Sequence, residues 1–368
     1  MQLEAIAEKV HSGTRLNAAE ALFLFDPAVD LHCVGQLADV VRRRRYGVRA
    51  FYNINAHLNP TNVCVYRCPL CAYSCDVGDA KAYVLDEEEI LCRGRVAEEA
   101  GCTELHIVGG VHPEKGFDWY RGIIRLLHGA FPRLHLKAWT PVEIMAMAQR
   151  AGLSVQAVLE QLIEAGLGSL PGGGAEIFAP RVRQQISPAK ADGDTWLDVH
   201  RTAHRLGLRS NATMLFGHVE TAAERVEHLL RLRQLQDETG GFQVFIPLAF
   251  HPENTRLAHL EKPSGLDDLR ALAVGRLVLD NFKHIKAYWI SLGVGTAQVA
   301  LAYGADDLDG TVRQEKIHHD AGSQAPEVLS VEDLEGLIRE AGCEPVERDS
   351  LYHRVRREGR AWQVVEAG

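Results

Sequence analysis

Three cysteines close together are the residues of this sequence with the most specific chemistry. Cys64, Cys68 and Cys71 have the spacing C-x3-C-x2-C within the stretch 59–75. This spacing lets one compact loop hold three corners of a cubic [4Fe-4S] cluster, and it leaves the fourth iron without a protein ligand. A structural metal site normally closes its coordination, whereas a reactive centre keeps one position open. The triplet therefore predicts chemistry at iron.

A fourth cysteine, Cys75, lies four residues beyond the triplet and leaves a second interpretation open. If Cys75 were also a ligand, the cluster would be closed, as in an electron-transfer ferredoxin, or the thiols would bind zinc. The chain would then be a non-catalytic protein that carries electrons or binds a partner.

The cysteine loop resembles that of the radical S-adenosylmethionine (SAM) enzymes. In that superfamily the open iron binds the amino and carboxylate groups of SAM, and the reduced cluster generates a 5'-deoxyadenosyl radical. Leu70 stands where these enzymes commonly have an aromatic residue. The resemblance implies a [4Fe-4S] cluster and SAM as cofactors, with Cys64, Cys68 and Cys71 as the metal ligands.

Other residues are similar to SAM-binding segments of that superfamily. Gly109 and Gly110 resemble a glycine pair whose backbone can approach the SAM amino group because no Cβ intrudes, but the usual acidic residue after the pair is missing. Asn211 resembles the segment that holds the SAM ribose, and Glu176 is another candidate for that role. Tyr73 of the cysteine loop is a further cofactor-binding candidate.

Four segments narrow the resemblance to one family: 171–178, 210–220, 246–255 and 304–311. Taken as a set, they resemble the aminofutalosine synthases, radical SAM enzymes of the futalosine route to menaquinone. The similarity extends from about residue 53 to residue 352. The related cyclic dehypoxanthine futalosine cyclases and the deazaflavin-precursor synthases are the alternatives.

The resemblance implies a defined reaction. The adenosyl radical adds to the enol-ether double bond of 3-[(1-carboxyvinyl)oxy]benzoate, and rearrangement with loss of bicarbonate gives 6-amino-6-deoxyfutalosine. SAM is consumed as a co-substrate. The partners implied are this aromatic dicarboxylate and a one-electron reductant such as flavodoxin or ferredoxin.

Two sets of side chains are candidates for handling the substrate. Its carboxylates require cations, for which arginine is well suited because it forms bidentate pairs. The substrate-binding candidates are Arg181, Arg183 and Lys190. Proton transfers need groups whose pKa burial can tune. The catalytic candidates are His218, His251 and Glu220.

The elements that must position these residues alternate along the chain. Apolar residues recur at helical spacing over 3–45, and a predicted strand at 51–58 leads into the cysteine loop. Strands and helices then repeat through about eight units, which predicts an α/β fold with a parallel sheet covered by helices. At this length we expect a single (β/α)8 TIM-like barrel with its chemistry at the C-terminal ends of the strands. A partial, open barrel is the alternative.

The pattern also predicts the positions of the elements. Strands are predicted at 51–58, 104–108, 134–139, 209–216, 242–250 and 284–290. Helices are predicted at 86–100, 117–130, 141–151, 154–165, 192–206, 222–237, 265–282 and 296–302. We divide the chain into an N-terminal helical extension (1–50), the barrel core (51–320) and a C-terminal helical extension that packs on the barrel (321–368).

Composition and charge disfavour several classes of protein. The 368 residues are 46% hydrophobic and 24% charged, as in an ordinary globular protein. The formal net charge of -9 argues against nucleic-acid binding. No apolar run approaches the ~20 residues that a membrane-spanning helix needs, so we expect no membrane partner and a cytoplasmic location. The isolated cysteines predict reduced thiols rather than disulfides; they are Cys33, Cys92, Cys102 and Cys343.

Overall fold

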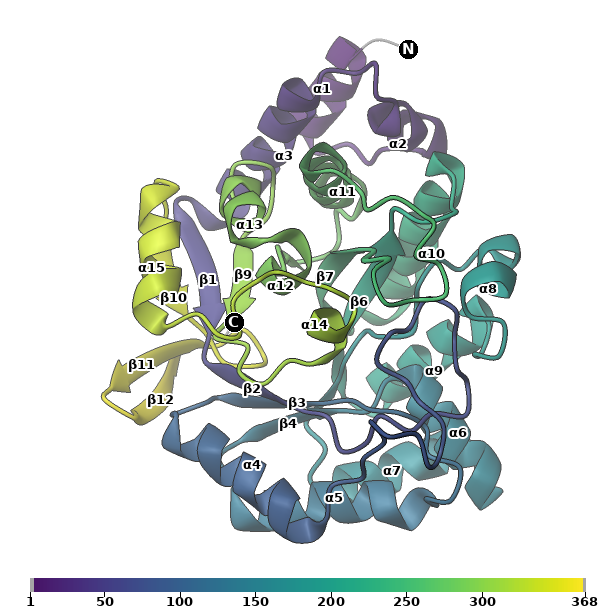
Figure 1. Cartoon of the computed structure of the whole chain (residues 1–368). Coiled ribbons are helices and arrows are strands. Elements are labelled where there is room, and N and C mark those ends of the chain that lie inside the picture. The colour runs from purple at the N-terminus through teal and green to yellow at the C-terminus, as the bar shows by residue number, and fades with distance from the viewer. Residues whose placement is uncertain (1–2, 367–368) are drawn as a thin grey trace.

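A seven-stranded parallel sheet forms the centre of the computed structural model, which describes residues 3–366 (Figure 1). The strands are β2 (Asn55–Leu58), β3 (Glu104–Ile107), β4 (His135–Ala138), β5 (Ser169–Leu170), β6 (Arg209–Phe216), β7 (Phe242–Ala249) and β8 (His284–Ile285). They lie side by side in chain order, each parallel to the next. This is the order expected when helical crossovers connect neighbouring strands.

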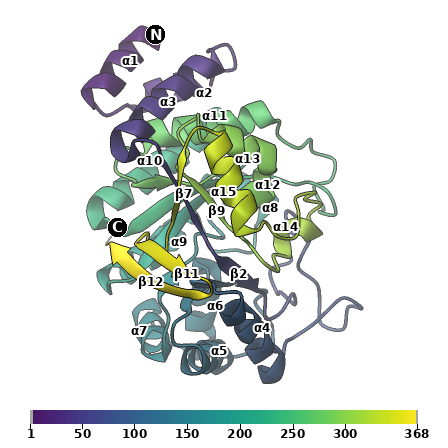
Figure 2. The same ribbon diagram turned by 90° about the vertical axis from the view of Figure 1, so that its left-hand side faces the viewer.

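Helices cover the outer face of the curved sheet (Figures 1 and 2). They are α4 (Glu87–Glu99), α5 (Phe117–Ala130), α6 (Pro141–Ala151), α7 (Val155–Ala165), α8 (Pro180–Ile186), α9 (Gly193–Arg205), α10 (Ala222–Thr239), α11 (Gly265–Val278), α12 (Trp289–Leu292) and α13 (Val294–Ala300). Capping boxes begin four of them, at Asp86, Thr140, Thr221 and Ser264. The predicted helices 117–130 and 141–151 are confirmed to the residue. The capping box at Thr140, which depends only on local sequence, accounts for the start of the second.

The predicted closed (β/α)8 barrel is wrong, and the partial, open barrel is correct. The first and last strands of the sheet, β2 and β8, do not pair with each other. The gap between them is crossed by β9 (Asp307–Gly310) and the residues after it, whose ladder pairing with the two edges is limited to the isolated bridges Lys286–Asp307 and Ala56–Arg313. No continuous ladder closes the ring, because β9 pairs along its length with a different strand.

That strand is β1 (Arg49–Asn53), which lies between β9 and β10 (Glu344–Glu347) in a separate parallel sheet. The single strand predicted at 51–58 is therefore two strands. They separate at Ile54, because the Thr311 hydroxyl accepts a hydrogen bond from the Asn55 backbone N–H at 3.1 Å and donates one to the Asn55 carbonyl at 2.8 Å.

Both ends of the chain pack on the barrel (Figure 2). The N-terminal extension is helical as predicted, with α1 (Leu3–Ser12), α2 (Ala18–Phe25) and α3 (Leu31–Tyr46). The prediction of a helical C-terminal extension is wrong in part. Besides α15 (Val331–Glu340) it contains β10 and a hairpin of β11 (Arg354–Glu358) and β12 (Ala361–Glu366). The division at residues 50 and 320 stays a prediction.

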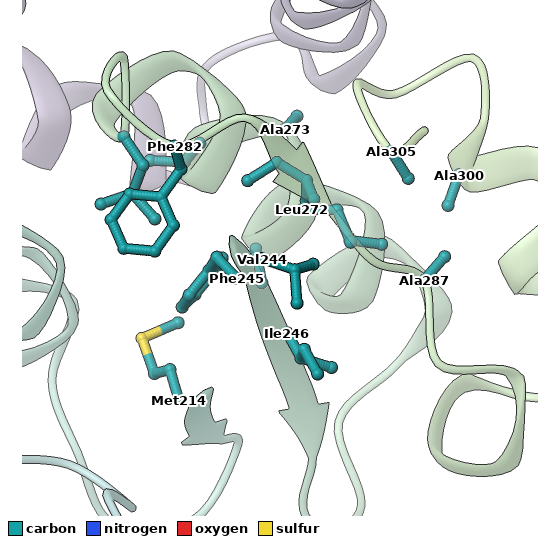
Figure 3. Packing of buried hydrophobic residues seen from close by; sticks show 14 of the residues in the cluster. Met214, Val244, Phe245, Ile246, Leu272, Ala273, Phe282, Ala287, Ala300 and Ala305 are labelled. Atoms are coloured by element: carbon teal, nitrogen blue, oxygen red, sulfur yellow. The ribbon is translucent and has the colours of Figure 1, made fainter. Parts of the chain in front are cut away.

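Buried apolar side chains fill the space between the sheet and its helices (Figure 3). Phe245 of β7 points toward α11, and its ring lies 6.5 Å from that of Phe282. A Cβ at Gly275 of α11 would lie 2.9 Å from the Phe245 ring, so this glycine lets the helix approach the strand. The next residue, Ile246, faces the opposite side, where it lines a cavity. Within residues 3–366 no helix has the length and apolar character needed to cross a bilayer.

Candidate active site

A cavity of about 310 Å³ lies inside the partial barrel, toward the C-terminal ends of its strands. The predicted metal ligands Cys64, Cys68 and Cys71 all line it. Seven further predicted residues also line it: Tyr73, Gly109, Gly110, Glu176, Lys190, Asn211 and His251. The fold thus brings together all the cysteine and cofactor candidates at the barrel interior, with one catalytic candidate, His251, and one substrate-binding candidate, Lys190.

The cysteine loop is held by backbone hydrogen bonds within the loop. The Cys71 N–H donates to the Cys68 carbonyl at 3.0 Å, and the Cys64 N–H donates to the Cys75 carbonyl at 3.1 Å. Cys75 is fully buried in this backbone pairing and does not line the cavity. Its burial raises the pKa of its thiol. The arrangement favours three thiol ligands over four.

The three thiols fit a cluster better than a single ion. Within residues 3–366 no three His, Cys, Asp or Glu side chains lie close enough to hold one metal ion. A tetrahedral zinc site would require such close ligands, whereas a cubic cluster holds its thiolates further apart, at separate irons. The donor set therefore fits a [4Fe-4S] cluster.

The glycine pair packs directly against the cysteine loop. The Gly110 N–H donates to the Thr61 carbonyl at 2.8 Å, and a Cβ on Gly110 would lie 2.2 Å from the Val63 carbonyl oxygen. The absence of a side chain is thus required by the loop itself. Tyr73 has a similar packing role, since its hydroxyl donates to the Thr61 carbonyl at 3.0 Å and burial raises its pKa.

Two predicted cofactor residues present unused or charged groups to the cavity. Asn211 is buried, and its side-chain oxygen has no hydrogen-bond partner. A buried acceptor without a partner is costly, so it fits a ligand that donates there. Glu176 has a positive φ of 47° and forms an ion pair of 2.6 Å with Lys190. Burial alone would raise the pKa of Glu176, but Lys190 lowers it.

Lys190 lies beside the cysteines. Burial opposes its positive charge, but Glu176 and the thiols of Cys68 and Cys71 raise its pKa and keep it protonated. We call the group formed by Cys64, Cys68, Cys71, Glu176 and Lys190 the cysteine end of the cavity.

Four predicted residues do not line the cavity. Arg181 is half-exposed and pairs with Glu224 at 2.6 Å. Arg183 is buried, but its guanidinium donates to backbone carbonyls, including that of Ala175 at 2.7 Å, and so holds the glycine-rich loop. Their proposed role in binding substrate carboxylates is not supported, because neither guanidinium reaches the cavity.

The pair His218 and Glu220 is likewise outside the cavity. Nε2 of His218 donates to the Leu215 carbonyl at 3.0 Å, and Glu220 lies 2.7 Å from Arg225. Burial alone would raise the pKa of Glu220, but hydrogen bonds from His218 and the charge of Arg225 hold it at about 2. These side chains stabilise the turn before α10, so their proposed catalytic role is not supported.

His251 is the one predicted catalytic residue that faces the cavity. Its Nε2 lies 2.8 Å from the Ser291 carbonyl, so this nitrogen carries the proton. Burial lowers its pKa to about 4, and the ring is neutral at pH 7. Nδ1 is then a buried acceptor without a partner.

Side chains from within the strands, or directly after one in the case of Lys286, form the deep part of the cavity, and the sequence analysis missed them. Lys137 and Glu104 pair at 2.6 Å, and Lys286 and Asp309 pair at 2.8 Å. All four are buried and line the cavity, and we call these two ion pairs the floor. Burial alone would raise the pKa of Glu104, but the charges of Lys137 and Lys286 hold it well below its ordinary value.

Two stacked histidines complete the deep part of the cavity. The rings of His57 and His106 are 4.7 Å apart with an interplanar angle of 6°. Burial lowers the pKa of both. A signal for these residues exists in the sequence, because polar residues recur with a period of two on neighbouring strands: Asn55 and His57, Glu104 and His106, His135 and Lys137.

The segment after β9 covers the cavity. Figure 1 shows α14 (Ile317–Asp320) over the centre of the partial barrel, where Ile317 and His318 line the cavity. Val312 and Gln314 have positive φ values of 47° and 66°. Such a conformation is costly for a β-branched residue and is often found at functional sites.

Two protein-family models match the chain. The model of the radical SAM superfamily matches residues 58–232, and the model of the CofH/MqnC C-terminal region matches residues 239–359. Among solved structures, that of methylornithine synthase has a TM-score of 0.73 at 18% sequence identity, covering 92% of this chain and 97% of that chain. The likeness to methylornithine synthase concerns the fold alone.

Several relatives match over nearly the whole length of the chain. The aminodeoxyfutalosine synthase of Thermus thermophilus is 46% identical over 100% of this chain and 98% of that protein. The aminodeoxyfutalosine synthase of Streptomyces coelicolor is 43% identical over 95% of this chain and 93% of that protein. The cyclic dehypoxanthine futalosine synthase of the same organism is 37% identical over 96% of this chain and 89% of that protein.

Proposed function

The chain belongs to the radical SAM superfamily and, within it, to the aminodeoxyfutalosine synthase family of the futalosine route to menaquinone, and from this premise we propose how its cavity divides between cofactor and substrate. The chain is an enzyme, so the non-catalytic iron-sulfur or zinc interpretation is wrong. Identity to the cyclic synthase is lower, 37% against 46%, which favours the aminodeoxyfutalosine reaction over the related alternatives.

We assign a [4Fe-4S] cluster and SAM to the cysteine end. Cys64, Cys68 and Cys71 would hold three irons and leave the fourth for SAM, since Cys75 lies outside the cavity. When bound, these groups supply a 5'-deoxyadenosyl radical. Asn211 would accept a hydrogen bond from a SAM hydroxyl, because its side-chain oxygen has no other partner.

We reassign Lys190 from substrate binding to cofactor binding. Its ammonium lies beside Glu176 and near Cys68, not among the floor residues. A cation at this position balances the negative charge that three thiolates bring to a buried site. It is also placed to pair with the carboxylate of a bound amino-acid group.

We assign the substrate 3-[(1-carboxyvinyl)oxy]benzoate to the floor. Lys137 and Lys286 each have one carboxylate partner, and an ammonium has three donors, so both can also donate to a substrate carboxylate. Apolar side chains of β6 and β7 form the wall against which an aromatic ring can pack. These side chains are Leu215, Ile246 and Leu248.

His251 is the remaining candidate for proton handling. Its unpartnered Nδ1 can accept a proton or a hydrogen bond from the substrate during the rearrangement. The buried walls of the cavity exclude water and hold the reacting carbons together, which is required because a primary carbon radical takes hydrogen from any group that it contacts. The products would be 6-amino-6-deoxyfutalosine, bicarbonate and the methionine released from SAM.

One observation carries this proposal: three cysteine thiols and two buried lysines open into the same cavity of about 310 Å³. A one-electron reductant such as flavodoxin or ferredoxin would reduce the cluster, and we place the reaction in the cytoplasm.

The test is anaerobic reconstitution of the cluster, followed by incubation with a chemical reductant, SAM and the enolpyruvyl benzoate. We expect a product whose mass shows that the adenosyl group has become joined to the benzoate. Free 5'-deoxyadenosine without this adduct would contradict the assignment. Turnover of dehypoxanthine futalosine to a spiro product would instead indicate the cyclase reaction.

A further inference from the structure

Tyr288 is a buried phenol in the cavity wall to which the assignments above give no role. It is 6% exposed and lines the cavity. Among residues 3–366 its hydroxyl has no hydrogen-bond partner, and its oxygen is not enclosed by protein atoms, so it opens into the cavity. Burial raises the pKa of Tyr288 well above its ordinary value, so the hydroxyl keeps its proton and can donate. A buried donor without a partner is costly and suits a ligand that accepts there.

The carboxylates around Tyr288 do not take this hydrogen bond. They are Asp309 and Glu315, and both also line the cavity. Each has a basic partner of its own, since Asp309 pairs with Lys286 at 2.8 Å and Glu315 pairs with His319 at 3.1 Å. The acceptor for the Tyr288 hydroxyl must therefore come from a ligand.

The backbone fixes the position of Tyr288 relative to the floor. It remains extended after β8, because the Lys286 N–H donates to the Phe245 carbonyl at 2.9 Å and the Ala287 N–H donates to the Asp307 carbonyl at 2.8 Å. Side chains two residues apart on an extended chain point the same way, and both Lys286 and Tyr288 line the cavity. Tyr288 thus lies about 6–7 Å beyond the floor lysine, toward the C-terminal ends of the strands.

The ring of Tyr288 is held in place by its neighbours. It packs against the edge of His318 of α14, with the ring centres 5.3 Å apart and an interplanar angle of 76°. The Tyr288 carbonyl accepts a hydrogen bond from the Ser291 N–H at 3.0 Å, which begins α12. The phenol is therefore positioned before any ligand binds.

The shape of the assigned substrate places one acceptor at this level. If the carboxylate on the benzoate ring lies at the floor, the enolpyruvyl group extends toward the C-terminal ends of the strands. It must do so, because its double bond has to meet the adenosyl radical from the cysteine end. The second carboxylate is attached to that double bond, so it lies beyond the floor lysines.

We propose that the Tyr288 hydroxyl donates a hydrogen bond to the enolpyruvyl carboxylate of the substrate. This inference rests on the assignment of the substrate to the floor. A neutral phenol holds a carboxylate less strongly than an ammonium does. Strong binding of the ground state alone does not accelerate a reaction, so a neutral donor suits the carboxylate that is removed, and the floor lysines suit the one that is retained.

The experiment measures binding, without turnover. Reconstituted enzyme with SAM and no reductant is titrated by calorimetry with 3-[(1-carboxyvinyl)oxy]benzoate and with 3-vinyloxybenzoate, which lacks only the enolpyruvyl carboxylate. Tyr288→Phe removes the hydroxyl and keeps the ring against His318. We expect the Kd of this variant for the dicarboxylate to be about 10–100-fold above that of wild type, as for loss of a hydrogen bond to a charged group. The Kd for vinyloxybenzoate should be unchanged.

A matched control removes a buried phenol elsewhere. Tyr303→Phe deletes a hydroxyl that lies 2.5 Å from Nδ1 of His32, outside the cavity, and this variant should bind both ligands like wild type. Equal weakening of both ligands in Tyr288→Phe would show that the hydroxyl acts on packing or on the part that the ligands share. That result, or unchanged affinity for the dicarboxylate, would overturn the proposal. Failure of wild type to bind either ligand would contradict the proposed function instead.

Discussion

The two ends of the cavity are built in different ways. At the cysteine end, one continuous loop presents three thiols, and backbone hydrogen bonds such as that from Cys71 to Cys68 fix its shape. At the floor, side chains of separate segments form ion pairs, Lys137 with Glu104 and Lys286 with Asp309. The cysteine end thus depends on spacing within a short sequence, whereas the floor depends on the register of the sheet.

This difference predicts different consequences of mutation. A thiol can be removed from the loop without disturbing its backbone bonds, so the fold should survive while the metal is lost. An ammonium cannot be removed from the floor without leaving a buried carboxylate uncompensated. Changes at the floor should therefore affect both stability and substrate binding.

The largest effect is expected for Cys68→Ser. Loss of one of three thiolates should abolish the cluster and all turnover, while the unfolding temperature of the apoprotein changes little. Iron analysis and visible absorption after reconstitution measure this directly. Cys75→Ala is the control and should keep four irons per chain and bind SAM. Loss of iron in the control would show that Cys75 is a ligand and that the cluster is closed.

The next effect is expected at the floor. Lys137→Met leaves Glu104 buried without its cation and should lower the free energy of unfolding by about 3–5 kcal/mol. The double variant Lys137→Met with Glu104→Gln removes both charges and should recover much of that stability, as measured by urea unfolding. If Lys137 binds the substrate, the double variant still loses about 10–100-fold in kcat/KM for the benzoate at saturating SAM. If the double variant recovered both stability and kcat/KM, the floor would have a purely structural role.

A smaller effect is expected at His251. His251→Gln keeps an amide near Nε2, which can donate to the Ser291 carbonyl, but removes the acceptor at Nδ1. We expect kcat to fall about 10-fold, as for loss of one hydrogen bond. His251→Asn places its amide oxygen near the Nδ1 position and should retain more activity than the glutamine variant. If the asparagine variant were instead less active than the glutamine variant, activity would depend on the hydrogen bond to the Ser291 carbonyl and not on the free acceptor at Nδ1.

The smallest effect concerns pH. Burial, and repulsion from His57, hold the pKa of His106 well below its ordinary value of 6.5, so the folded chain keeps this ring neutral. The unfolded chain binds a proton as the pH falls below about 6.5, so this contribution to stability is complete above that pH and is lost below it. Lowering the pH from about 7.5 to 5.5 should cost about 1 kcal/mol through His106.

The variant His106→Phe keeps the stacking surface without the titration. Its free energy of unfolding, measured in urea at both pH values, should fall by about 1 kcal/mol less than that of wild type. If the free energy of unfolding depended on pH identically in the two proteins, the His106 ring would be in contact with water in the folded state.

The sequence predicted the cysteine end well and the floor poorly. The Cys64–Cys71 spacing, the bounds of α5 and α6 and the long strand β6 are local features, and all lie where they were predicted. Barrel closure was predicted wrongly because the partner of β1 is β10, almost three hundred residues away in the chain. Pairing over such a distance is decided by tertiary packing.

Two of the three predicted cations lie outside the cavity for a related reason. Arg181 and Arg183 follow the glycine-rich loop in sequence, but the helix that they begin directs them to Glu224 and to backbone carbonyls. Lys137 stands in the predicted strand 134–139 and was not among the substrate-binding candidates. Its alternation with His135, matched by Glu104 and His106 on the neighbouring strand, was the available signal for a polar barrel interior.

A structure of the reconstituted enzyme with SAM and the benzoate bound tests the central claim most directly. We predict that the SAM amino and carboxylate groups lie at the fourth iron, and that a benzoate carboxylate lies within hydrogen-bonding distance of Nζ of Lys137 or Lys286. A substrate whose carboxylates instead contact Arg181 or Arg183, with the floor ion pairs untouched, would contradict the division of the cavity.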